Sequence, residues 1–164
     1  MTDDEKFSLA SARHAADEGR LAEWVVDFLA SPGSSNSALA AAFALSGASY
    51  AGPIRFALER LTPMAGPIGD DVVVPEPESY WEAEVEAMER SIEQGWHPPP
   101  LLVSHHDGKY CLEDGNHRYE TLRRMGATDA WIVLIFAGEV ERDRFLNEYR
   151  SSPTGAGDTS NSDP

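Results

Sequence analysis

Residues 101–136 carry the pattern that most constrains the fold of this chain. Two short strand-like stretches, Leu-Leu-Val at 101–103 and Lys-Tyr-Cys-Leu at 109–112, flank the pair Asp107-Gly108. An Asp-Gly pair between two strand-like stretches is typical of a β-hairpin closed by a tight turn. We therefore expect two adjacent strands in this region.

The hairpin is followed by a helix and a further strand. Residues 117–125 place apolar side chains at helical spacing, and Gly126 stands at the C-terminal end of that pattern. Residues 131–136 are all apolar and have the length of a buried strand. The succession predicts a domain that contains both strands and helices.

Four other stretches have the spacing or composition of helices, namely residues 10–30, 37–45, 79–94 and 140–149. In the third of them, one side is apolar and the other is rich in glutamate, which is typical of a helix packed on a core. Asn36 or Ser35 is expected to cap the second helix. Ser79 is expected to cap the third, and Gly95 to end it.

The chain between the second and third helices is less regular. Residues 54–61 alternate for part of their length and predict a strand, although Ile54, Leu58 and Leu61 also satisfy helical spacing. Residues 64–77 are rich in Gly and Pro and predict a loop with one short apolar run at 72–74.

Charge and cysteine content restrict the class of protein. Thirteen basic and 28 acidic side chains give a formal charge of −15, which disfavours direct binding to the nucleic-acid backbone. The single cysteine, Cys111, cannot form an intramolecular disulfide. The acidic N-terminus does not predict a secretory signal, and the apolar run 130–137 is far shorter than the roughly 20 residues of a membrane helix. We expect a cytoplasmic protein with no membrane association.

These patterns divide the chain into three segments. Residues 1–50 are expected to form an N-terminal helical extension, residues 51–150 an α+β domain, and residues 151–164, rich in Ser, Gly, Asp and Pro, a disordered tail. The sequence leaves open whether the residues before 54 form a separate lobe or pack on the same core.

The candidate chemistry lies in residues 114–118, between a predicted strand and a predicted helix. Backbone N–H groups and the helix dipole favour an anion at such a place. Gly115 lets a ligand approach the backbone, and Asn116 can cap the helix or hold the ligand. His117 and Arg118 add donors, and the arginine can bind a phosphate through two hydrogen bonds. The pattern predicts a phosphate-binding turn.

The alternative is that the turn is purely structural, with Asn116 as a cap and Arg118 as a surface charge. A binding site requires the Arg118 guanidinium and the helical N–H groups to converge on an open cleft, whereas an ion pair with Asp114 or Glu120 favours the alternative. If the turn binds a nucleotide, we expect Arg118→Glu to abolish binding and to leave the fold intact.

Phosphoryl transfer also requires a base or a magnesium ligand. Glu113 and Asp114 are the nearest carboxylates, and strand alternation sends them to opposite faces. We assign Asp114 to the site as the candidate catalytic residue, with a turn-forming role as its alternative. His105 and His106 also point to opposite faces of a strand, so the histidines do not predict a metal site.

From residue 54 to residue 136 the chain resembles the ParB/sulfiredoxin superfamily. The resemblance rests on the order of the 79–94 helix, the stretches Pro-Leu-Leu-Val at 100–103, Asp-Gly-Lys-Tyr at 107–110, Asp-Gly-Asn-His-Arg-Tyr at 114–119 and Leu-Arg-Arg-Met-Gly at 122–126, and the 131–136 strand.

The resemblance implies an α+β fold with a small mixed β-sheet flanked by helices, and a strand–turn–helix motif that binds nucleotide phosphates. Branches of the superfamily include CTP-hydrolysing partition proteins, ATP-using sulfiredoxins and a free-serine kinase. By position, Gly115, Asn116, His117 and Arg118 would hold the phosphates. The implied cofactors are ATP or CTP with Mg²⁺, and the implied reaction is nucleotide hydrolysis or phosphoryl transfer.

Asn116 departs from the pattern of the superfamily, because sulfiredoxins have a catalytic cysteine there and partition proteins commonly a glutamate. Cys111 lies on the preceding strand, so we expect no sulfiredoxin activity. The absent glutamate argues against partition-type CTP hydrolysis, whereas phosphate binding can survive. The rival hypothesis is a catalytically silent module that binds a protein, or a DNA-associated, partition-like accessory protein.

Overall fold

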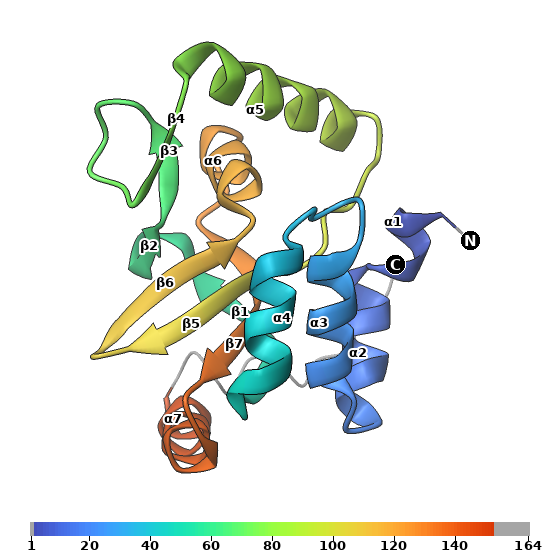
Figure 1. Cartoon of the computed structure of the whole chain (residues 1–164), viewed down its shortest axis with the longest axis vertical. Helices are drawn as coiled ribbons and strands as arrows, with labels where there is room; N and C mark the ends of the chain where they lie inside the picture. The colour runs from blue at the N-terminus through green and yellow to red at the C-terminus, as the bar shows by residue number, and fades with distance from the viewer. Residues whose placement is uncertain (1, 153–164) are drawn as a thin grey trace.

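The computed structural model describes residues 2–152, and its main sheet has helices against both faces (Figure 1). The helices are α1 (Asp3–Lys6), α2 (Leu9–Asp17), α3 (Leu21–Ala30), α4 (Ser37–Ser46), α5 (Glu78–Glu93), α6 (Asn116–Arg124) and α7 (Glu139–Ser151). The strands are β1 (Ser49–Ala57), β2 (Leu61–Pro63), β3 (Ala65–Pro67), β4 (Val74–Glu76), β5 (Leu101–His106), β6 (Lys109–Asp114) and β7 (Asp129–Phe136). This content confirms the α+β class.

The main sheet is mixed and has the order β1-β7-β5-β6-β2. β5 and β6 form the predicted antiparallel hairpin, whose turn residues Asp107 and Gly108 have φ of 49° and 75°, the backbone sign that a tight hairpin turn requires. β7 runs parallel to β5 and antiparallel to β1, and β2 runs parallel to β6. The expected small mixed sheet is therefore confirmed.

Helices bury both faces of β7, an interior strand of the sheet. Val133 and Ile135 belong to a cluster with the apolar side chains of α2, α3 and α4. Ile132 and Leu134, the alternate residues, belong to a second cluster that receives side chains of α6 and α7. Because successive strand residues face opposite sides, one strand contributes to both clusters. The N-terminal helices therefore pack on the same core as the sheet.

Two predicted elements differ in extent from those observed. The single helix expected over residues 10–30 is two helices, α2 and α3, because the chain turns at Gly19, where φ is 71°. The strand expected over 54–61 is β1, which starts at Ser49 and is followed by a 3-10 turn (Leu58–Arg60). The predicted strand is thus confirmed over its first half only.

The expected loop at 64–77 contains a small parallel pair, β3 and β4. Helix α5 follows, but its N-cap is Pro77 and no side chain of residues 2–152 caps it, so the predicted Ser79 cap is wrong. Ser151, assigned to the tail by the sequence, is the last residue of α7, and residues 153–164 lie outside the described part of the chain. Among the helices that the structure describes, none is both long and apolar enough to cross a membrane.

Candidate functional site

Gly115 makes the turn between β6 and α6. Its φ is 100°, and it stands at the N-cap position of the helix. A Cβ atom at this position would lie 2.7 Å from Nη2 of Arg118 and 2.7 Å from Cδ2 of Leu101. Both the positive φ and the close approach require glycine.

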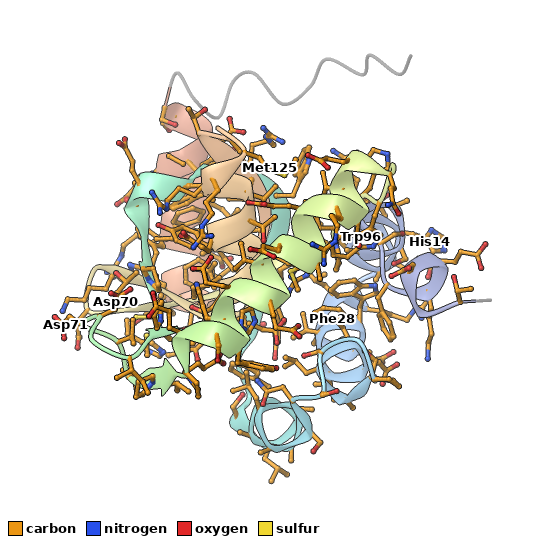
Figure 2. The ribbon with its side chains drawn as sticks, turned by 90° about the horizontal axis from the view of Figure 1, so that it is seen from above. His14, Phe28, Asp70, Asp71, Trp96 and Met125 are labelled. Atoms are coloured by element: carbon orange, nitrogen blue, oxygen red, sulfur yellow. The ribbon has the colours of Figure 1, made fainter. Side chains whose placement is uncertain are left out.

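A cavity of about 150 Å³ opens at this turn and brings all of residues 114–118 together. The first turn of α6, the N-terminal helices and the C-terminal end of α5 surround it. Trp96 and Phe28 lie on the side of the N-terminal helices, away from the Asp70 and Asp71 loop (Figure 2). The other lining residues are Asp4, Phe7, Ser31, Gly33, Ser34, Met88 and Pro99.

Arg118 lines this cavity as a buried, paired residue. Its side chain is 7% exposed, and its Nη2 donates to Oδ2 of Asp114 over 2.7 Å. Its Nη1 donates to the carbonyl oxygen of Pro99 over 3.0 Å. Burial lowers the pKa of the guanidinium and the Asp114 carboxylate opposes this, and an arginine with such a partner stays charged.

This burial corrects two expectations about Arg118. It is not a surface charge, and Arg118→Glu would not leave the fold intact, because that change would bury two neighbouring carboxylates without a cation. The ion pair with Asp114 nevertheless favours the alternative in which the turn is structural.

Asn116 does not cap α6. Both polar atoms of its side chain are hydrogen-bonded within the protein. Its Oδ1 accepts from the backbone N–H groups of Met64 and Ala65 over 2.9 and 3.1 Å, and its Nδ2 donates to the carbonyl oxygen of Leu112 over 3.2 Å. The amide therefore joins the β2–β3 connection to the start of α6. Since the side chain is engaged in this way, the group that Asn116 can offer to a ligand is its backbone N–H in the first turn of α6.

His117 is also engaged with the protein. Its Nε2 lies 2.8 Å from Oε2 of Glu76, and its ring lies 4.5 Å from that of Trp81. These contacts connect α6 to β4 and α5. Nε2 of His117 is therefore already in contact with a carboxylate.

The start of α6 carries backbone N–H donors that no described side chain uses. The first N–H groups of a helix have no partner within the helix, and no side chain in the described part of the chain caps α6. These groups stand at the positive end of the helix dipole, and the residues to which they belong, 116–118, line the cavity. The backbone donors available to an anion at this place are therefore those at the start of α6.

Asp114, the predicted catalytic residue, has both carboxylate oxygens occupied. Oδ1 accepts from the hydroxyl of Ser34 over 2.8 Å and Oδ2 from Arg118 over 2.7 Å. Glu113 instead accepts from the hydroxyl of Ser104 and does not line the cavity. The side chains of these two residues thus have separate surroundings.

The residues present do not build a magnesium site by themselves. Across residues 2–152, no group of three or more His, Cys, Asp or Glu side chains is placed to hold a metal ion. Mg²⁺ is often bound by one or two carboxylates together with substrate phosphates, but both oxygens of Asp114 already accept hydrogen bonds. No step can be assigned to this ion from the residues of the site.

Cys111 has the properties of a structural cysteine. Burial raises the pKa of its thiol, and the neighbouring Glu113 carboxylate raises it further. The thiolate, which is the nucleophilic form, is therefore disfavoured.

Nine of the cavity residues were not predicted as parts of the site, among them Ser34, Phe28 and Trp96. Phe28 and Trp96 read as apolar residues of helices or helix ends, and Ser34 as part of a polar connection. No local spacing signals that these segments reach the turn at 114–118. Their role depends on how the N-terminal helices pack on the sheet.

No family model and no curated protein sequence matches the chain. Solved structures that match include a free serine kinase in complex with AMP, with 23% identity over 49% of this chain and a TM-score of 0.38. A sulfiredoxin from Arabidopsis thaliana matches with 22% identity over 56% of this chain and 92% of its own, with a TM-score of 0.35.

A Pnob8-like ParB-N domain matches with 18% identity over 71% of this chain and 40% of its own, with a TM-score of 0.37. The chain spans only 30% of the length of the free serine kinase. These neighbours come from the three branches that the sequence resemblance names. At such TM-scores they assign neither an activity nor a ligand to this chain.

Proposed function

We propose that the chain binds a phosphate-bearing ligand, a nucleotide, at the N-terminus of α6. The observation that carries the proposal is the cavity at this point, which is lined by all of residues 114–118 and by the start of a helix that no described side chain caps. Backbone N–H groups at a helix start are a general binding site for phosphate oxygens.

In this proposal the side chains of the turn fix its shape and do not bind the anion themselves. Arg118 and Asn116 hold the turn in place through the contacts of Pro99, Asp114 and Met64, and the backbone binds the anion. Half-buried Trp96 lines the same cavity and offers an aromatic surface of the kind on which a flat ring packs. A cavity of about 150 Å³ accommodates part of such a ligand and leaves the remainder outside.

Ligand binding, rather than catalysis, is the activity that the geometry supports. Hydrolysis or transfer of a terminal phosphate of ATP or CTP with Mg²⁺, in the cytoplasm, is the finer hypothesis. Asp114 is its candidate catalytic residue, and it would have to leave Ser34 or Arg118 to act on a ligand.

The proposal is tested at Met88, which lines the cavity from α5 and is half-buried. Met88→Glu and Met88→Gln have nearly the same shape and differ by one negative charge. At an effective dielectric constant near 20, a charge several ångströms from a phosphate costs roughly 1–2 kcal/mol, or about tenfold in affinity. We expect calorimetric titration with pyrophosphate, ATP and CTP to show that much weaker binding for Met88→Glu than for Met88→Gln.

The charge effect should shrink at high ionic strength. Equal affinity of the two Met88 variants would place the bound phosphate elsewhere. Thermal unfolding of both variants checks that the difference does not come from loss of structure.

A silent protein-interaction module is the second candidate. The Arg118–Asp114 ion pair favours it, because the arginine is already neutralised within the protein. Absence of binding of pyrophosphate, ATP and CTP to the unmodified chain, with and without Mg²⁺, would support this candidate.

A further inference from the structure

The cavity at the start of α6 is built jointly by the N-terminal helices and the sheet domain. Its lining includes six residues from the first 34 positions of the chain. They are Asp4, Phe7, Phe28, Ser31, Gly33 and Ser34. The N-terminal segment is therefore a wall of the site and not only a cover for one face of the sheet.

One of these residues makes a direct polar contact with the turn. The hydroxyl of Ser34, in the connection between α3 and α4, donates to Oδ1 of Asp114 over 2.8 Å, and the two residues are 80 positions apart in the chain. Oδ2 of the same carboxylate accepts from Arg118. Because each oxygen has its own donor, rotation of the carboxylate would break a hydrogen bond in a place where the Asp114 side chain is only 12% exposed.

A second contact reaches Arg118 from the same helices. Its guanidinium lies over the ring of Phe28, 5.3 Å from the centroid, a geometry that favours a cation. Phe28 is itself fixed by stacking on Trp24, with ring centroids 5.3 Å apart. The N-terminal segment thus contacts both residues of the Asp114–Arg118 pair. The Ser34 hydroxyl donates to the carboxylate, and the Phe28 ring packs against the guanidinium.

We propose that Ser34 is a positioning residue for the phosphate site, and this inference rests on the proposed function. The Ser34 hydroxyl keeps the Asp114 carboxylate turned toward Ser34 and Arg118. Without that donor, Oδ1 of Asp114 loses its hydrogen bond, the bond from Arg118 to Oδ2 remains, and Oδ1 can turn toward the cavity. A carboxylate that faces the cavity repels an incoming phosphate.

The test compares Ser34→Thr with Ser34→Val. Thr and Val have the same branched shape, so a steric effect on the loop is common to both, and only Thr retains the hydroxyl. We expect Ser34→Thr to bind pyrophosphate within about twofold of the unmodified chain. Ser34→Val should bind roughly tenfold more weakly, because the Asp114 carboxylate that turns toward the cavity repels the phosphate.

Ser35→Ala is the matched control. The Ser35 hydroxyl donates to the carbonyl oxygen of Pro32 and does not line the cavity, so its removal should leave pyrophosphate binding unchanged. Thermal unfolding of each variant is recorded beside the titration, since a purely structural role of Ser34 would lower the melting temperature without a difference in affinity between Thr and Val.

The outcomes separate this inference from the proposed function. If the unmodified chain does not bind pyrophosphate, the proposed function fails and the inference fails with it. If the unmodified chain binds pyrophosphate and Ser34→Val binds it as well as Ser34→Thr, the proposed function stands and the role of Ser34 is overturned.

Discussion

At the scale of single residues, the turn depends on Gly115 because backbone and packing exclude a side chain there independently. The φ of 100° is costly for any residue with a Cβ. The space that a Cβ would occupy is taken by Arg118 and Leu101. Arg118 is in turn held by Asp114 and Pro99, so it cannot move aside without loss of hydrogen bonds.

Gly115→Ala should therefore destabilise the protein more than Gly126→Ala does. Gly126 also has a positive φ, of 87°, but a Cβ added there would have no atom of residues 2–152 within 4 Å, its own chain neighbours aside. Each change carries the backbone cost of about 1–3 kcal/mol, and only the first adds a steric clash. Urea unfolding of the two variants measures the difference, and equal losses would show that Arg118 and Leu101 yield without cost.

At the scale of elements, charged side chains connect α5 to α6. Arg124 donates to both carboxylate oxygens of Glu82, over 2.7 Å each, and to Oε1 of Glu120 over 2.7 Å. Arg123 also donates to Glu120. These ion pairs join α5 to α6, against which α5 packs (Figure 1). α5 also supplies Met88 to the cavity.

Stability should depend on pH through Glu120. Burial alone would raise the pKa of Glu120, but the hydrogen bonds from Arg123 and Arg124 outweigh it, and the pKa is lowered. The folded state then binds the proton less tightly than the unfolded state. The stabilisation is present above the unfolded-state pKa of about 4.3 and is lost as the pH falls through the folded-state value.

We expect Glu120→Gln to lower the free energy of unfolding by about 1 kcal/mol at neutral pH, and by progressively less as the pH falls below about 4. Urea unfolding from pH 7 to pH 3 measures this. Glu86→Gln, on an exposed part of α5 with only a 3.8 Å contact to Arg90, is the control. A loss at Glu120 that does not change with pH would point to packing rather than charge.

At the scale of the whole molecule, the N-terminal helices and the sheet share one core. Phe28 and Leu29 of α3 belong to the same buried cluster as Val133 and Ile135 of β7. Ser34 and Phe28 add contacts with the turn at the start of α6. A helical segment that separated from the sheet would expose this cluster to water.

The protein should therefore unfold in a single transition. Tryptophan fluorescence reports on Trp24 of α3, Trp81 of α5, Trp96 and Trp131 of β7. Its urea curve and that of far-UV circular dichroism should coincide. An early helical transition that leaves the sheet intact would show that the shared cluster contributes little to stability.

Local signals in the sequence determined the elements that build the site. The Asp107-Gly108 turn depends on the backbone conformations of two residues. The α5 helix depends on the period of its apolar side chains. Both can be predicted from residues that are close together in the chain. The turn at Gly115 is readable for the same reason, and it lies where the sequence placed it.

Tertiary structure decided what the side chains of that turn do. Asn116 bonds to backbone groups 51 and 52 positions away, Asp114 to a hydroxyl 80 positions away, and Arg118 is buried beneath helices far earlier in the chain. The sequence named these residues as candidates but could not show that their polar atoms are engaged within the protein. Backbone preferences act between neighbours, whereas the partners of a side chain depend on which distant segments the folded core brings together.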